Sequence, residues 1–183
     1  MVNRQRTSLA WTSLALGISV ATAAVAATPA AVDTSLRVAI DRAAIDKALV
    51  PTPTELFDLY QGRTWQWQAG GAYFSPRPRD FTAWSQADGQ NTYAKGRWLI
   101  STDGQVCFKA KWFTAKGAAS GLTCFAHRRV DSTIYQRRLP GGDWYVFKAA
   151  SPQLTQEYAK FKMGDEVSAE AEKVKAEISA AAN

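Results

Sequence analysis

Residues that commonly bind metals are scarce in this chain. Its 183 residues include two cysteines and a single histidine. A cysteine-built zinc site or an iron–sulfur cluster needs more cysteines, and a histidine-rich metal site needs more histidines. No glycine-rich phosphate loop or dinucleotide-binding motif is present either. The sequence therefore predicts neither a metal ion nor another cofactor.

Carboxylates are also sparse in the middle of the chain. No glutamate occurs between Glu55 and Glu157, and the five aspartates of residues 61–150 fall mostly at expected turns. An aspartate at a turn usually accepts hydrogen bonds from the nearby backbone. A glycosidase needs two carboxylates that face each other across the bond to be cut. The pattern does not favour that class of enzyme.

Nucleophilic catalysis has few candidates. His127 is the one histidine available as a base, and no Gly-x-Ser-x-Gly motif presents a serine for it. Strand alternation places His127 on the side of Phe125, which is typical of a half-buried structural histidine. We therefore expect a protein that is not an enzyme. A small cell-envelope hydrolase that uses His127 with an Asp is the alternative.

Long apolar runs are confined to the N-terminus. Two arginines precede an apolar stretch at residues 9–20, and the small residues Ala24-Val25-Ala26 follow it. This order is typical of a secretory signal peptide over residues 1–27, cleaved near Ala26 or Ala27. An uncleaved membrane anchor is the alternative, although Ala, Ser and Thr make this a weak span. We expect an exported periplasmic protein with no membrane span after cleavage.

Residues 61–150 are predicted to form a β-rich domain. Short runs of Trp, Tyr, Phe, Val and Ile alternate there with turn residues such as Thr102-Asp103-Gly104 and Pro140-Gly141-Gly142. Connections this short join antiparallel neighbours. We expect an eight-stranded antiparallel meander that forms a barrel or a strongly curved sheet. The expected strands cover residues 63–68, 72–75, 80–86, 91–101, 105–113, 121–130, 132–139 and 143–149.

Helical segments are predicted on both sides of this domain. In residues 28–60, Thr52 can cap a short helix, with Pro53 at its first position and Glu55 completing a capping box. In residues 151–183, the stretch from Ser168 to Ala182 is rich in Ala, Glu and Lys, which favour helix. Its few apolar residues predict a C-terminal helix that packs loosely or extends into solvent.

Charge is distributed unevenly along the chain. Residues 61–150 hold 13 basic and five acidic residues, a surplus of eight positive charges, whereas both helical flanks are slightly acidic. A field of that sign attracts anions. The same region holds 16 of the 21 aromatic residues, and Trp65 and Trp67 share one face of an expected strand. Most of these rings are expected to fill the core.

Basic and aromatic residues interleave on three of the expected strands, as in Lys95-Gly96-Arg97-Trp98. Surfaces that stack rings and pair with anions have this composition. Because a periplasmic location argues against nucleic acid, we expect an anionic envelope polysaccharide or lipid as the ligand. A solvated exterior of the sheet is the alternative role for these charges. The expected contact residues are Arg97, Lys109, Lys111, Arg128, Arg137 and Arg138.

The two cysteines, Cys107 and Cys124, lie 17 positions apart on consecutive expected strands. In an oxidising compartment such a pair predicts a structural disulfide. A redox pair is the alternative, although redox catalysts favour the closer Cys-x-x-Cys spacing.

Several motifs occur together in a fixed order along the β-rich region. They are Gly62-x-Thr64-Trp65-x-Trp67, Gly70-Gly71-x-Tyr73-Phe74, Gly96-Arg97-Trp98, Gly104-x-x-Cys107, Cys124-Phe125-x-His127-Arg128 and Gly142-Asp143-Trp144-Tyr145-x-Phe147. This ordered set resembles the proteobacterial family catalogued as domain of unknown function 995, and the resemblance covers about residues 55–148. It implies an exported protein with a lipocalin-like β fold and a Cys107–Cys124 pair, and it brings no established activity or catalytic residues.

Taken together, the sequence predicts a non-enzymatic cell-envelope protein that binds an anionic glycan or lipid. Besides the hydrolase, a second alternative is an assembly or inhibitor partner that docks through the C-terminal helix of residues 151–183.

Overall fold

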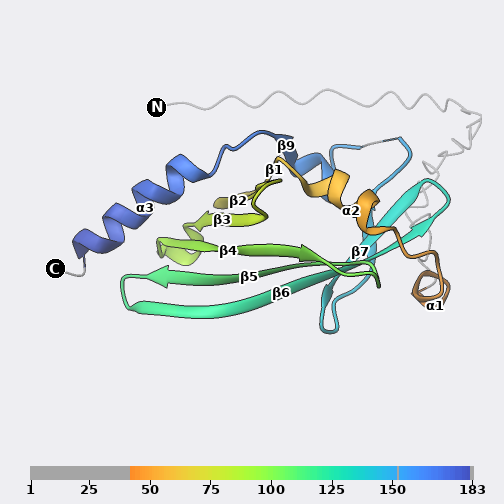
Figure 1. The fold of residues 1–183 in the computed structure, drawn as a ribbon, viewed down its shortest axis with the longest axis horizontal. Coiled ribbons are helices and arrows are strands. Elements are labelled where there is room, and N and C mark those ends of the chain that lie inside the picture. Colours follow the sequence, from red (N-terminus) through yellow and green to blue (C-terminus); the bar gives the residue numbers. More distant parts are fainter. Residues whose placement is uncertain (1–41, 152, 182–183) are drawn as a thin grey trace, which may run out of the picture. The chain divides into compact units, whose positions relative to one another are not determined.

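The computed structural model describes residues 42–151 and 153–181 (Figure 1). The signal peptide expected over residues 1–27 lies outside the described residues. Nine antiparallel strands form one strongly curled sheet, which has the shape of a half-barrel. The strands are β1 (Arg63–Trp67), β2 (Gly70–Phe74), β3 (Asp80–Ser85), β4 (Thr92–Ile100), β5 (Gln105–Thr114), β6 (Gly117–Val130), β7 (Thr133–Leu139), β8 (Tyr145–Lys148) and β9 (Phe161–Met163).

The sheet is a meander from β1 to β8, which confirms the expected antiparallel order of eight strands. The ninth strand was not predicted. It returns from the C-terminal side and pairs with β1, where Arg63 lies opposite Met163. β8 and β9 are therefore the two edges of the sheet. A short 3-10 helix, η2 (Glu157–Lys160), contacts both edges and bridges the gap with side chains.

The described helices are short. They are α1 (Arg42–Asp46), α2 (Pro53–Tyr60) and α3 (Ser168–Ala181), with a second 3-10 helix, η1 (Ala87–Gly89). The capping box predicted for α2 is confirmed: Thr52 Oγ1 accepts from the Glu55 amide at 3.2 Å, and Glu55 Oε2 accepts from the Thr52 amide at 2.7 Å. None of the described helices is long and apolar enough to cross a membrane.

Helix α2 fills one half of the concave side of the sheet. Leu56, Leu59 and Tyr60 are buried there against rings from the strands. Tyr60 stacks on Phe147 with a centroid distance of 5.9 Å and meets Phe74 edge to face at 5.2 Å. This part of the concave side is a packed aromatic core, as the sequence predicts for most of the aromatic residues.

Helix α3 packs on the other, convex side, where it lies beside β3 and β4 (Figure 1). Ala171 and Val174 are buried against Tyr93, and Lys95 Nζ lies 3.2 Å from a carboxylate oxygen of Glu172. The expectation that this helix packs loosely or extends into solvent is wrong. Two small buried residues are enough because the sheet supplies the large partners, Tyr93, Trp84 and Phe113.

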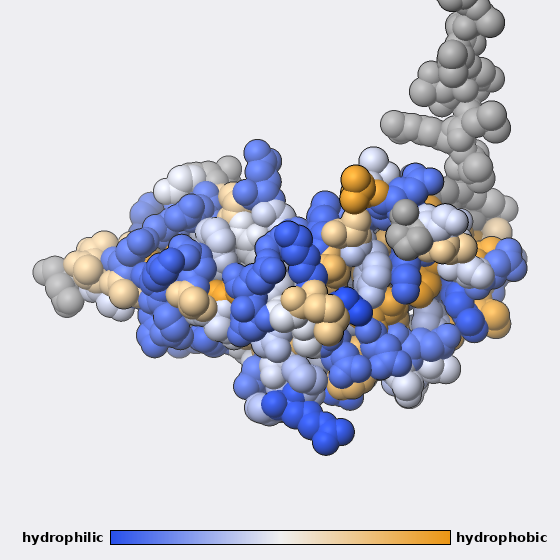
Figure 2. All heavy atoms as spheres, turned by 90° about the horizontal axis from the view of Figure 1, so that it is seen from above, coloured by the Kyte–Doolittle hydropathy of each residue, from blue (hydrophilic) through white to orange (hydrophobic). Residues whose placement is uncertain are grey.

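The exterior is mainly hydrophilic in the face shown in Figure 2, with hydrophobic residues in small, separate groups.

The disulfide prediction is confirmed. Cys107 and Cys124 lie directly opposite each other on β5 and β6 and are bonded, with 4.0 Å between their Cα atoms. Both side chains lie on the convex side of the sheet, since they alternate with the core residues Val106 and Phe125.

Candidate functional site

One row of side chains across the concave face has a tryptophan at each end and three alanines between them. In register order from β1 to β5 the row reads Trp65, Ala72, Ala83, Ala94 and Trp112. Alanine side chains are short, so the larger rings at both ends stand above them. The row lies beyond the part of the concave side that α2 fills.

This arrangement leaves an open trough of about 210 Å³, which we call the tryptophan trough. All but two of its lining residues are apolar, and only Arg138 is charged. Trp65 and Trp67 line it together, which confirms that they share one face of β1. The lining consists of Trp65, Trp67, Ala72, Phe81, Phe108, Trp112, Thr123, Phe125 and Arg138.

The rings of the trough are held in place by one another. Trp65 meets Phe125 edge to face at 5.3 Å and Trp67 edge to face at 6.5 Å. The indole N–H of Trp65 donates to Glu157 Oε1 at 2.8 Å, which fixes the orientation of this ring. All three tryptophans of the trough, Trp65, Trp67 and Trp112, are only partly buried. The trough is therefore a preformed aromatic surface with three partly accessible indoles.

Arg138 supplies the charge of this site. It lies opposite Phe125 across β6 and β7, and its side chain is exposed. None of the ion pairs between residues that the structure describes involves Arg138. A guanidinium presents a planar fork of donors that matches a carboxylate or phosphate. Arg138 is thus placed to pair with an anion that enters the trough.

The six basic residues expected to contact a ligand do not form one surface. Arg138 is on the concave face, whereas Arg97, Lys109 and Lys111 point to the convex face. The convex face also holds Arg128 and Arg137. The reason is strand alternation: consecutive residues such as Arg137 and Arg138 point to opposite sides of the sheet.

Arg128 and Arg137 have structural partners near α1. Arg137 forms an ion pair with Asp46 at 3.3 Å and stacks over the Trp144 ring at 4.6 Å. Arg128 donates to the carbonyl of its neighbour His127 at 2.8 Å and lies 5.9 Å from the Trp144 ring. These contacts attach α1 to the convex face.

His127 is fully buried, more than the half-buried position expected for it. Its Nε2 lies 2.9 Å from the Tyr60 hydroxyl, and its Nδ1 lies 3.3 Å from the carbonyl oxygen of Gly104. A carbonyl oxygen only accepts, so the proton is on Nδ1 and Nε2 accepts from Tyr60. Gln136 then donates to the Tyr60 hydroxyl at 2.6 Å and accepts from Tyr145.

Burial controls the ionisation of these hydrogen-bonded side chains. It lowers the pKa of His127 to about 4, so the imidazole is neutral at physiological pH. Burial also raises the pKa of Tyr60 well above its usual value and raises that of Tyr145. Among the described residues, no aspartate or glutamate is hydrogen-bonded to His127. These side chains form a neutral hydrogen-bond network that satisfies buried polar atoms.

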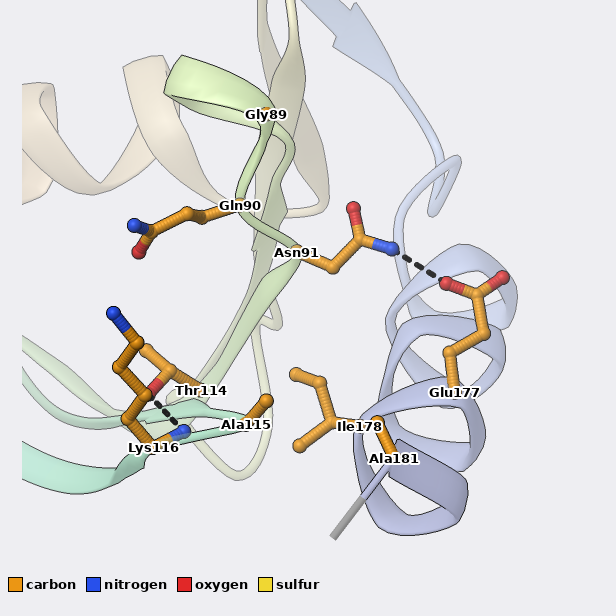
Figure 3. Close-up of a pocket in the computed structure, with 9 residues that line it drawn as sticks. All are labelled: Gly89, Gln90, Asn91, Thr114, Ala115, Lys116, Glu177, Ile178 and Ala181. Atoms are coloured by element: carbon orange, nitrogen blue, oxygen red, sulfur yellow. Dashed lines mark hydrogen bonds between the residues drawn. The ribbon is translucent and has the colours of Figure 1, made fainter.

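A second groove, of about 370 Å³, lies between α3 and the tip of the β5–β6 hairpin (Figure 3). Ile178 and Ala181 of α3 form one side, and Thr114, Ala115 and Lys116 form the other. Asn91 Nδ2 donates to Glu177 Oε2 at 2.6 Å across its end. The groove lacks the aromatic rings of the tryptophan trough.

No group of three or more metal-binding side chains occurs in the described ranges, 42–151 and 153–181. In a comparison with known protein families, the family described as "Protein of unknown function (DUF995)" matches residues 17–167. This is a longer stretch than the 55–148 covered by the motifs above. No curated protein and no solved structure matches the chain.

Proposed function

The chain belongs to the DUF995 family, whose function is unknown, and we propose from the tryptophan trough that it is an exported, non-enzymatic cell-envelope binding protein. Its ligand is an acidic sugar residue of an anionic envelope glycan. The protein holds the sugar without changing it.

One observation carries this proposal: the trough combines three partly accessible indole rings with an arginine that has no acidic partner among the described residues. Sugar rings present C–H groups on one face, and aromatic side chains supply flat apolar surfaces for such groups. The guanidinium of Arg138 pairs with the carboxylate or phosphate of an acidic sugar. Contact with Trp67 and Trp112 favours ligands that contain a sugar ring, and Arg138 favours ligands that carry a negative charge.

The size of the trough favours a single ring. Its volume of about 210 Å³ is below the roughly 300 Å³ at which sites for drug-sized ligands start. A glycan can place one acidic residue in the trough while the rest of the chain stays in solvent.

The export part of the proposal rests on the signal-like N-terminus and the disulfide. The order of charged, apolar and small residues over residues 1–27 is that of a secretory signal. The Cys107–Cys124 bond suits an oxidising compartment such as the periplasm.

The test is calorimetric titration with short oligogalacturonates, with neutral maltooligosaccharides of the same length as the control ligand. We expect binding of the acidic sugar only. Arg138→Gln should weaken it by about 10- to 100-fold, since one charge-assisted hydrogen bond contributes about 1.5–3 kcal/mol. Arg137→Gln is the matched control, because it removes the same charge one residue away on the opposite face, and it should leave affinity unchanged.

Equal affinity of the wild type and Arg138→Gln would contradict the proposal, as would equal binding of neutral and acidic sugars. Chromatography of the sugar after long incubation distinguishes the hydrolase. Cleavage products that disappear in His127→Gln would establish the enzymatic alternative instead.

A further inference from the structure

Four basic side chains form a block on the convex face, beside α3. Lys95 lies directly opposite Lys111, and Arg97 lies directly opposite Lys109, across β4 and β5. Side chains in such positions are about 5 Å apart at Cβ, and like charges there are destabilising. Like charges paired in this way oppose folding unless they are neutralised, so the arrangement points to a role outside the fold.

The block is only partly neutralised within the protein. Lys95 pairs with Glu172 at 3.2 Å, and Arg97 pairs with Asp80 at 3.7 Å. Lys109 and Lys111 take part in none of the ion pairs that the described residues form. Both lysines are exposed. Two charges therefore remain available to an external anion.

Two exposed leucines adjoin this block. Leu122 is 64% exposed and lies directly opposite Lys109 on β6. Leu99 is 45% exposed, follows Arg97 by two positions on β4 and therefore points to the same side. The Cys107–Cys124 disulfide crosses the sheet beside them and holds β5 and β6 in register. We call Lys95, Arg97, Leu99, Lys109, Lys111 and Leu122 together the basic-leucine face.

We propose that the basic-leucine face rests on an anionic phospholipid bilayer. Lysine and arginine attract lipid phosphates, while the leucines enter the boundary between headgroups and acyl chains. Lysine stems lie along apolar surface and keep their ammonium groups at headgroup level.

The kind of apolar residue argues for lipid over nucleic acid. Surfaces that bind nucleic acid stack bases on exposed aromatic rings. The nearest rings on this face, Tyr93 and Phe113, stack on each other at 4.6 Å and pack in the cluster under α3. The exposed apolar residues beside the lysines, Leu99 and Leu122, are aliphatic.

This inference is independent of the proposed glycan ligand, because the two sites use different residues on opposite faces of the sheet. If both operate, the tryptophan trough faces away from the bilayer. The protein then presents its glycan site to the space above the membrane surface.

The test is co-sedimentation of the exported protein, purified with its natural N-terminus, with phosphatidylglycerol vesicles and with phosphatidylcholine vesicles. We expect binding to the anionic vesicles only. Each basic residue at an anionic surface changes partitioning about fivefold, so Lys109→Glu/Lys111→Glu should weaken binding by about 30-fold or more.

The matched control is Arg77→Glu/Lys162→Glu, which makes the same change in net charge at two exposed positions outside the face. It should change binding little. Equal loss in both double variants would overturn the proposal, because it would assign binding to net charge alone. Absence of binding by the wild type would also overturn it.

A leucine variant separates a bilayer from a merely anionic polymer. Leu99→Ser/Leu122→Ser should weaken vesicle binding several-fold and leave binding to soluble polyglutamate unchanged. Unchanged vesicle binding by this variant would contradict insertion of the face into lipid.

Discussion

The Tyr60 hydroxyl and His127 Nε2 share a hydrogen bond of 2.9 Å at the centre of the protein, between residues 67 positions apart. It joins helix α2, on the concave side, to β6, the longest of the described strands. Burial keeps this imidazole neutral at physiological pH, because it lowers the pKa of His127 to about 4. The stability of the protein therefore depends on the protonation state of one residue.

Stability should fall as the pH is lowered from 6.5 to 4. His127 has a pKa of about 4 in the folded protein and 6.5 when unfolded, so the unfolded chain binds the proton first. Stabilisation is complete above pH 6.5 and decreases by about 3 kcal/mol down to pH 4. Urea unfolding at pH 7.5, 6.0 and 5.0 measures this. His127→Gln should be less stable at pH 7.5 but nearly independent of pH above 5.

The three carboxylates with shifted pKa values, Glu55, Asp103 and Asp165, do not interfere between pH 7.5 and 5.0, because their pKa values are lowered from reference values that already lie below pH 5. A wild type with constant stability between pH 7.5 and 5.0 would show that His127 is not buried as neutral imidazole.

Replacing either of two tryptophans on the concave face by alanine should have different effects on stability and on sugar binding. Trp98 is 1% exposed, and its indole N–H donates to the Ser75 carbonyl, so Trp98→Ala should lower the free energy of unfolding by about 3–5 kcal/mol. Trp112→Ala should cost less than half as much and should abolish oligogalacturonate binding. Calorimetry and urea unfolding of both variants test this. Retained sugar affinity in Trp112→Ala would remove that ring from the site.

Loss of the disulfide should destabilise the protein without changing its fold. Cys107 and Cys124 are 17 positions apart, and closing a loop of that size stabilises by about 3 kcal/mol in the chain-entropy model. The free energy of unfolding of Cys107→Ala/Cys124→Ala should therefore be lower by about 3 kcal/mol, and its urea midpoint should be lower accordingly. A reductant should shift the wild type to the same midpoint and leave the variant unaffected. Any shift of the variant by reductant would contradict this assignment.

Helix α3 should detach when its buried face is charged. Val174 is 1% exposed against the sheet, and burying a valine side chain contributes about 2 kcal/mol. Val174→Asp should lose that contribution and expose the helix to protease. Ala176→Asp is the control, since Ala176 is exposed on the same helix. Limited proteolysis followed by mass spectrometry distinguishes them, and equal cleavage of both variants would show that α3 is not held by this contact.

The strand order of this protein was predictable because it depends on local chemistry. Short turns between β-rich runs dictate antiparallel neighbours, and a single cysteine on each of two consecutive runs predicted the pairing of Cys107 with Cys124. Alternation along β1 correctly placed Trp65 and Trp67 on one face. The capping box of α2 was equally local.

The sites were less predictable because they depend on the curl of the sheet. Alternation shows that Arg137 and Arg138 point to opposite sides, but it does not show which side becomes concave. The row from Trp65 to Trp112 is formed by five strands. Only the register of these strands shows that its three alanines lie side by side between the two tryptophans. β9 was missed because three residues, Phe161–Met163, are too few to show an alternating pattern.

The open seam of the half-barrel affects how the protein behaves at high concentration. Edge strands offer unpaired backbone groups to other chains, and long flat edges promote aggregation. Here the edges β8 and β9 are only four and three residues long, and η2 with Tyr158 packs between them. A second molecule would find few backbone hydrogen bonds to form at either edge. The sheet can thus stay open without becoming a template for fibrils.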